Sequence, residues 1–236
     1  MTRRFLFAGI RTLSATLLEA EGISRQAVDG TWLLHDVRLT LAAGERVAIV
    51  GPTGAGKTLL LRSLALLDPL QAGQVLWQGA SVESAAVPRF RSQATYLHQR
   101  PALFEGTVES NLRMPFALRV NRDKTYEPNR LAGYLQLLGC SSSFLGRSTR
   151  DLSGGERQIV AALRAIQLHP LMLLLDEPTA ALDPASALII ESLVARWHAE
   201  HGAMRSVIWV SHNAEQAARV ADRVLQLQAG RIQGAG

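Results

Sequence analysis

Residues 47–58 read Val-Ala-Ile-Val-Gly-Pro-Thr-Gly-Ala-Gly-Lys-Thr, an apolar run that leads directly into a glycine-rich loop. The loop fits the pattern G-x-x-x-x-G-K-[ST], in which glycines let the backbone curl so that successive N–H groups point at a polyphosphate. The helix predicted after it would add its positive dipole end at the same place. Lys57 can then reach the β- and γ-phosphates, and the Thr58 hydroxyl can ligate Mg²⁺. The predicted phosphate-binding residues are Gly51, Pro52, Thr53, Gly54, Ala55, Gly56, Lys57 and Thr58.

Two more apolar runs end in polar residues in the same way. Residues 171–175 are followed by Asp176 and Glu177. Residues 207–210 are followed by a serine and His212. Short, continuous apolar runs are typical of strands buried on both faces of a parallel sheet. Because ligands collect at the carboxyl ends of such strands, we expect the glycine loop, the two carboxylates and the histidine to meet at one site.

Asp176 and Glu177 are candidates for two different tasks. Asp176 would hold Mg²⁺, as the second acidic element does in enzymes with this loop. Glu177 would orient or deprotonate the attacking water. An acidic pair after an apolar strand can also be a helix cap or a surface pair, but the phosphate loop in the same chain favours the functional interpretation.

The patterns around these runs indicate how the rest of the chain is organised. Val37, Leu39 and Leu41 alternate with polar residues, which is typical of a half-buried antiparallel strand. Residues 59–67 carry a leucine-rich helical pattern that stops at Asp68-Pro69.

Between about residues 87 and 154 the strand signals fade. The stretch 131–138 looks helical and is broken by Pro128 and by the serines at 141–143. We interpret 87–154 as a smaller helical subdomain inserted into the sheet domain. The predicted fold class is therefore α/β: a P-loop NTPase core with a mainly parallel sheet, an N-terminal antiparallel β subdomain and an inserted α-helical subdomain.

The first residues have a basic start and a short apolar stretch. Thr2-Arg3-Arg4 faintly resembles a twin-arginine export signal. Arg11 interrupts the apolar run, and no cleavage site of small residues follows. We therefore interpret residues 1–14 as an N-terminal extension, or the product of an upstream start codon, and residues 15–236 as the domain.

Composition limits the kind of partner. The formal net charge of +5 and the pI near 10.1 raise nucleic acid and anionic lipid as partners. Lys57 and Lys124 are the only lysines, and the arginines are scattered from end to end, so a solvated surface is favoured over a nucleic-acid groove. No apolar run reaches the ~18 residues of a membrane-spanning helix, so any membrane role must come through a partner. Cys140 is the only cysteine, which excludes an internal disulfide and suits a reducing compartment.

Residues 152–158 read Leu-Ser-Gly-Gly-Glu-Arg-Gln, and this stretch points to a family. It resembles the signature of ATP-binding-cassette (ABC) proteins and lies between the phosphate loop and the acidic strand end, as that family has it. Ser153, Gly154 and Gly155 can present a hydroxyl and bare N–H groups ahead of a helix over 156–168, which predicts a second phosphate-binding helix start. A helix-capping serine is the simpler interpretation, and both can hold at once.

The resemblance runs from about residue 15 to residue 232 and implies roles for three more residues. Gln99 is similar to the glutamine that senses Mg²⁺ and the attacking water. Asp183 resembles the aspartate that couples opposing sites across a dimer, and His212 resembles the switch histidine that contacts the γ-phosphate. The family also places an aromatic residue before the phosphate loop to stack on adenine. Residues 25–28 offer none, which leaves the selectivity for ATP over GTP open.

The resemblance implies an ATP-hydrolysing subunit with Mg²⁺ that drives a separate transmembrane permease, with two copies of the chain facing each other around ATP. Its expected place is the cytoplasm, peripheral on the inner face of the bacterial plasma membrane. A soluble ABC-family ATPase that works on DNA, ribosomes or protein assembly is the first alternative, and a non-hydrolysing scaffold is the second. No nucleic-acid partner is expected.

The cargo is a separate question. The short helical subdomain and the Ser-Gly-Gly-Glu signature are most similar to small bacterial ATPases paired with permeases that export iron or another metal. Import of a nutrient stays open as the alternative.

Overall fold

The chain folds around a six-stranded sheet in the order β10-β9-β3-β8-β7-β6, as the computed structural model shows for residues 15–233. Its strands are β3 (Arg46–Val50), β6 (Ala94–Leu97), β7 (Met172–Asp176), β8 (Ser206–Val210), β9 (Arg223–Gln228) and β10 (Arg231–Gln233). All neighbours pair in parallel except β9 and β10. The mainly parallel sheet and its three apolar strands are confirmed, each strand within one residue of the predicted ends.

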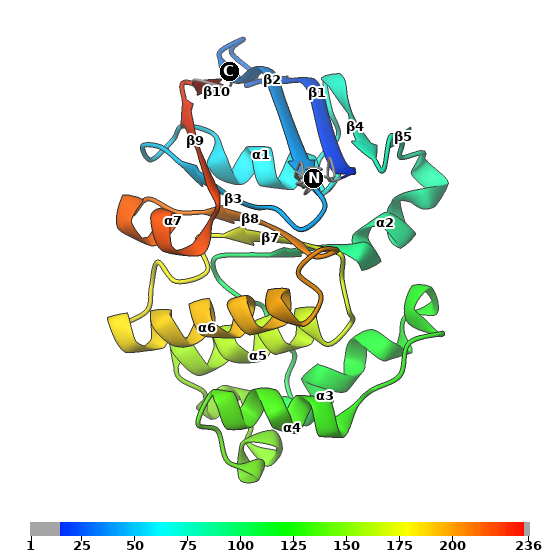
Figure 1. Ribbon diagram of the computed structural model, residues 1–236, viewed down its shortest axis with the longest axis vertical. Helices are drawn as coiled ribbons and strands as arrows, with labels where there is room; N and C mark the ends of the chain where they lie inside the picture. The colour runs from blue at the N-terminus through cyan, green and yellow to red at the C-terminus, as the bar shows by residue number, and fades with distance from the viewer. Residues whose placement is uncertain (1–14, 234–236) are drawn as a thin grey trace, which may run out of the picture.

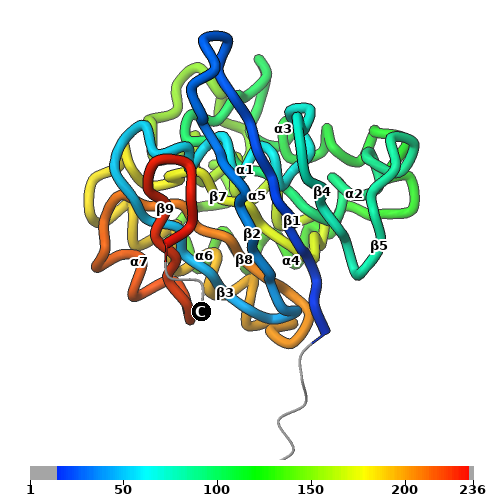
Figure 2. Tube along the Cα trace, turned by 90° about the horizontal axis from the view of Figure 1, so that it is seen from above, coloured from blue at the N-terminus to red at the C-terminus, as the bar shows by residue number. Residues whose placement is uncertain are grey.

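A second sheet is antiparallel throughout and has the order β2-β1-β4-β5. It consists of β1 (Thr16–Gln26), β2 (Trp32–Ala42), β4 (Ala72–Trp77) and β5 (Ala80–Ser81). Val37, Leu39 and Leu41 are buried on β2, as their alternation predicts. In Figure 1 this sheet lies above the central sheet, with α1 (Lys57–Leu64) between the two. Figure 2 shows the β9–β10 hairpin beside β2, where the His35 N–H donates to the Gly230 carbonyl (2.9 Å).

Helices cover the other face of the central sheet. The helices after α1 are α2 (Val87–Gln93), α3 (Val108–Arg113), α4 (Pro128–Leu137), α5 (Gly154–Ile166), α6 (Pro184–Glu200) and α7 (Ala214–Val220). Phe90 of α2 belongs to the core between the two sheets, so α2 is not one of the helices on the other face. In Figure 1, α5 and α6 lie below the central sheet, and α3 and α4 lie below them. One hydrophobic core therefore fills the space between the two sheets, and a second joins the central sheet to α3, α4, α5 and α6.

Two predicted helix boundaries were wrong. The helix predicted over 59–67 ends at Leu64, because Leu66 turns left-handed (φ 53°) and the Leu67 N–H closes the end by donating to the Arg62 carbonyl. Pro128 does not break α4 but stands in its first turn, where the missing proline N–H costs no helical hydrogen bond.

The helical insertion starts later than the predicted span of 87–154, because β6 lies inside that span and pairs with β7 in the central sheet. The part that leaves the sheet follows Leu97. Within it, residues 108–147 are closed off by a bridge between Thr107 and Ser148, where the Val108 N–H donates to the Arg147 carbonyl (3.0 Å).

The predicted N-terminal extension, residues 1–14, lies outside the described residues. Between residues 15 and 233, no helix is both long and apolar enough to cross a membrane.

Candidate active site

Three neighbouring strands end at the same edge of the central sheet. β8 lies between β3 and β7, with Ile49 opposite Val210 and Leu175 opposite Trp209. The phosphate loop follows β3, the two carboxylates stand at the end of β7, and His212 follows β8. The parallel register of β3, β8 and β7 brings the loop, the two carboxylates and His212 to one edge, as predicted.

The phosphate loop wraps around the start of α1. Gly56 is the N-cap of that helix and takes a left-handed conformation (φ 98°). The Lys57 side chain is only 6% exposed, and its Nζ donates to the carbonyls of Gly51 (2.8 Å) and Pro52 (3.1 Å). The loop thus holds the ammonium group over its own backbone, where its N–H groups and the positive end of α1 favour an anion.

Replacing two glycines of this loop by alanine would show the cost of backbone strain and the cost of steric crowding separately. Gly54 and Gly56 both have positive φ, but a Cβ on Gly54 would meet nothing within 4 Å. A Cβ on Gly56 would lie 2.7 Å from the Leu33 carbonyl oxygen. Gly54→Ala should cost about 1–2 kcal/mol in the free energy of unfolding. Gly56→Ala should cost about 1–3 kcal/mol more, because it also overpacks the loop against β2.

Urea unfolding of the two variants without nucleotide checks this difference. Equal losses of stability would contradict the close approach of β2 to the loop.

Asp176 is buried at the end of β7, and both of its carboxylate oxygens accept hydrogen bonds. Thr58 donates its hydroxyl to Oδ1 (3.0 Å), and Tyr96 donates to Oδ2 (2.8 Å). The structure therefore brings together the two residues predicted as magnesium ligands, Thr58 and Asp176. A hydroxyl and a carboxylate are oxygen donors of the kind that Mg²⁺ takes beside nucleotide phosphates.

Glu177 stands between two basic groups. Its Oε1 lies 3.6 Å from Lys57 Nζ, and its Oε2 lies 3.6 Å from His212 Nδ1. The residue has a positive φ of 45°, which is uncommon for a side chain with a Cβ and marks local strain. Its own N–H donates to the Val210 carbonyl of β8 (3.2 Å), which ties the strained turn to the neighbouring strand.

The segment Ser153–Gly155 opens α5 with reciprocal caps. The Ser153 hydroxyl accepts from the Glu156 N–H (3.2 Å), and the Glu156 carboxylate accepts from the Ser153 N–H (2.8 Å). The Arg147 guanidinium beside Glu156 lowers the pKa of that carboxyl, which keeps it charged for this role. Ser153 therefore caps α5, as the simpler interpretation predicts. Ser153 and Gly154 are also exposed, and within residues 15–233 they make no hydrogen bond to the phosphate loop.

Gln99 and Asp183 lie near the ends of strands and helices but outside the central cluster. Gln99 is exposed two residues beyond β6, and it has no hydrogen bond in the described part of the chain. Asp183 caps α6: its Oδ1 accepts from the N–H groups of Ala185 and Ser186 (both 3.0 Å). Hydrogen bonds from Ser186 also lower the pKa of the Asp183 carboxyl.

Tyr96 also belongs to the site, although no sequence motif indicated it. It lies on β6 opposite Leu174, two residues before Asp176 on the neighbouring strand, so its hydroxyl can reach that carboxylate. Burial and Asp176 raise the pKa of Tyr96 well above its usual range, so the phenol stays protonated and donates. The parallel pairing of β6 with β7 was the signal that could have revealed it.

A phosphate loop, a buried aspartate bonded to the loop threonine and a glutamate between lysine and histidine define a nucleoside triphosphatase of the P-loop class. The comparisons with known proteins narrow this class. The family model described as "ABC transporter" matches residues 34–180, which is more than half of the chain.

Relatives and solved structures agree with that match. The putative ABC transporter ATP-binding protein YjkB of Bacillus subtilis is 39% identical over 85% of this chain and 77% of its own length. The probable iron export ATP-binding protein FetA of Escherichia coli is 34% identical over 94% of this chain and 96% of its own length. The dimeric structure of MJ0796, a bacterial ABC transporter cassette, has a TM-score of 0.79 at 25% identity and covers 92% of this chain and 97% of that one.

ATP-binding proteins named for sulfate/thiosulfate import match as well. The one from Burkholderia mallei is 37% identical over 86% of this chain and 58% of its own length.

The chain belongs to the ABC transporter family. It is an ATP-binding and ATP-hydrolysing subunit of a transporter, so the predicted family, fold and activity are confirmed.

Proposed function

We propose that two copies of this chain close around two ATP molecules, and that closing and reopening drive a separate membrane permease. The observation that carries the proposal is that the phosphate-binding parts are split. One cluster is assembled at the strand ends, while the segment Ser153–Gly155, exposed at Ser153 and Gly154, makes no hydrogen bond to it within residues 15–233. A second copy would bring that segment across the interface, and the dimeric solved cassette supports this arrangement.

Within each site, the chain's own groups have separate tasks. Lys57 and the loop N–H groups hold the β- and γ-phosphates. Thr58 and Asp176, with Gln99, hold Mg²⁺, which when bound supplies positive charge beside the phosphates. Glu177 orients and deprotonates the water.

Two further residues respond to the nucleotide. His212 contacts the γ-phosphate from the end of β8. Asp183, the N-cap of α6 in the loop that follows Glu177, matches the aspartate that couples the two sites of the dimer in the family it resembles.

The shared site predicts complementation between two inactive variants. Lys57→Ala disables the phosphate loop, and Ser153→Arg disables the signature segment. An equal mixture should recover roughly a quarter of wild-type ATPase activity, because half of randomly formed dimers are mixed and each keeps one of its two composite sites. The measurement is phosphate release after mixing. Absence of recovery, when tagged chains demonstrably form mixed dimers, would rule out the shared site.

The permease is expected to dock on the helical insertion that follows Leu97. Gln99 stands at the entrance to this insertion, so it links the nucleotide to the docking surface. Such a partner places the chain in the cytoplasm, peripheral on the inner face of a bacterial plasma membrane.

For the cargo, we propose export of iron or another metal. The relative named for iron export supports this, because it matches this chain over nearly the full length of both. Import of a nutrient is the second candidate, because relatives named for sulfate/thiosulfate import match too.

Deletion of the gene tests the cargo. Cells without it should accumulate the metal and become sensitive to excess iron, and a plasmid copy should reverse both changes while a Glu177→Gln copy should not. Unchanged metal content together with defective uptake of sulfate or another nutrient would refute export.

A further inference from the structure

Gln216, near the start of α7, is buried and uses its whole side-chain amide. It is 8% exposed. Its Oε1 accepts from the Ser211 hydroxyl (2.9 Å), and its Nε2 donates to Thr179 Oγ1 (2.8 Å) and to Glu191 Oε1 (2.8 Å). An amide has two donors and one carbonyl oxygen, so both of its donors and its acceptor are used.

The three partners lie in three different elements around the site. Ser211 immediately precedes His212, and Thr179 lies two residues after Glu177. Glu191 projects from α6, whose first turn is capped by Asp183. One side chain thus joins the loop that carries His212, the loop that follows Glu177, and the helix behind both.

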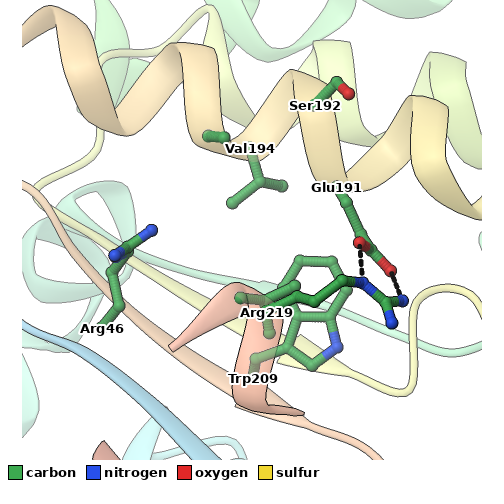
Figure 3. A pocket seen from close by; sticks show the side chains of 8 residues that line it. Arg46, Glu191, Ser192, Val194, Trp209 and Arg219 are labelled. Atoms are coloured by element: carbon green, nitrogen blue, oxygen red, sulfur yellow. Dashed lines mark hydrogen bonds and ion pairs between the residues drawn. The ribbon is translucent and has the colours of Figure 1, made fainter. Parts of the chain in front are cut away.

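The Glu191 carboxylate, which accepts a hydrogen bond from Gln216, is also held by a second residue of α7. Arg219 of α7 holds it with two hydrogen bonds, from Nη2 to Oε1 (3.1 Å) and from Nε to Oε2 (3.3 Å). Figure 3 shows this pair beside a cavity of about 190 Å³, with Trp209 of β8 below it. Arg219 therefore orients the Glu191 carboxylate independently of its hydrogen bond with Gln216.

The two loops flank an open pocket of about 520 Å³, and Thr179, His212 and Gln216 are among its lining residues. Glu177 and His212 nevertheless lie 3.6 Å apart, in a turn strained at Glu177. Strain of this kind persists only where surrounding contacts over-determine the conformation. Gln216 adds hydrogen bonds from the start of α7 to Ser211 and to Thr179, beside the bond from the Glu177 N–H to the Val210 carbonyl.

We propose that Gln216 is a positioning residue for ATP hydrolysis: its amide sets the position of the Glu177 loop relative to the His212 loop. This inference rests on the proposed function of those two residues. Gln216 is not among the residues proposed to touch the nucleotide, so it acts on turnover and not on binding.

The test replaces the amide by groups of similar shape. Gln216→Glu removes both donors and places a second carboxylate against Glu191. Gln216→Met removes the hydrogen bonds without adding charge. Both variants should lower kcat by about tenfold to a hundredfold, because misplacement of reacting groups on the ångström scale has effects of that size. ATP affinity measured by calorimetry should stay within about twofold of wild type.

A reciprocal exchange separates positioning from general damage. In the double variant Gln216→Glu/Glu191→Gln, the amide at 191 can donate to the carboxylate at 216. The Ser211 hydroxyl can keep donating to this position, and the Thr179 hydroxyl can turn from acceptor to donor. The double variant should regain at least a third of the kcat that Gln216→Glu loses, a coupling that a double-mutant cycle measures.

Gln167→Glu is the matched control. Gln167, at the C-terminal end of α5, is also buried, at 9% exposure. Its side-chain amide donates to the Leu112 carbonyl of α3. This control should lose thermal stability but keep the kcat of its folded fraction.

Each outcome decides the inference. A wild-type kcat in Gln216→Met, a loss no larger than that of the control, or no recovery in the exchanged variant would overturn it. The proposed function is judged separately: if wild type hydrolyses ATP and Glu177→Gln does not, that function stands however Gln216 behaves.

Discussion

Glu177→Gln is expected to slow ATP hydrolysis at least about a hundredfold while leaving ATP binding close to wild type. The amide keeps the shape of the side chain and its hydrogen-bonding reach but cannot accept a proton from water. The backbone strain at φ 45° is the same for both residues, so the fold of the turn is retained. Because ATP is bound but not cleaved, the variant should accumulate as an ATP-bound dimer.

The measurements are phosphate release and gel filtration with ATP and Mg²⁺. The matched control is Glu109→Gln on α3, where an exposed glutamate pairs with Arg113 away from the strand ends. That control should hydrolyse ATP at the wild-type rate. Turnover near wild type in Glu177→Gln would remove this residue from the chemistry.

Lys57→Ala is expected to weaken ATP binding roughly tenfold to a hundredfold. Hydrogen bonds that involve a charged group contribute about 1.5–3 kcal/mol, and each 1.4 kcal/mol changes affinity tenfold. The loss falls on binding because Lys57 is buried in the loop and its Nζ lies over the carbonyls of Gly51 and Pro52, where the phosphates are expected.

The chain offers a close control, since Lys124 is its one other lysine. Lys124 is half-buried, and its Nζ donates to the carbonyls of Ser92 (3.1 Å) and Leu168 (2.7 Å). Lys124→Ala therefore loses a comparable pair of carbonyl contacts without facing the phosphate loop. Titration calorimetry with ATP should show a wild-type affinity for it. Equal affinities in the two variants would contradict the role of Lys57.

The central part of the site could be predicted from sequence because each piece is local. The phosphate loop and the apolar runs before Asp176 and His212 are continuous in the chain, and parallel strands bring their ends to one edge. No pairing had to be known in advance to expect that Lys57, Asp176 and His212 meet.

The supporting residues could not be predicted in this way. Tyr96 reaches Asp176 only because β6 is the edge strand beside β7, and Gln216 reaches Thr179 only because the start of α7 lies beside the loop that follows β7. Both depend on contacts between segments far apart in the chain. The predicted end of α1 was wrong for another reason. The leucine pattern continues past Leu64, but the backbone turns left-handed at Leu66.

The bridge between Thr107 and Ser148 has an evolutionary consequence. Residues 108–147 of the helical insertion leave and return at nearly the same point, so their length and sequence can change without moving the strands that carry the site. With the permease docked on this insertion, as proposed, a lineage of such cassettes can acquire a new membrane partner by remodelling residues 108–147 while the strand ends stay the same. The junction thus separates the strand ends that carry the site, which can stay constant, from the inserted residues 108–147, which can be exchanged.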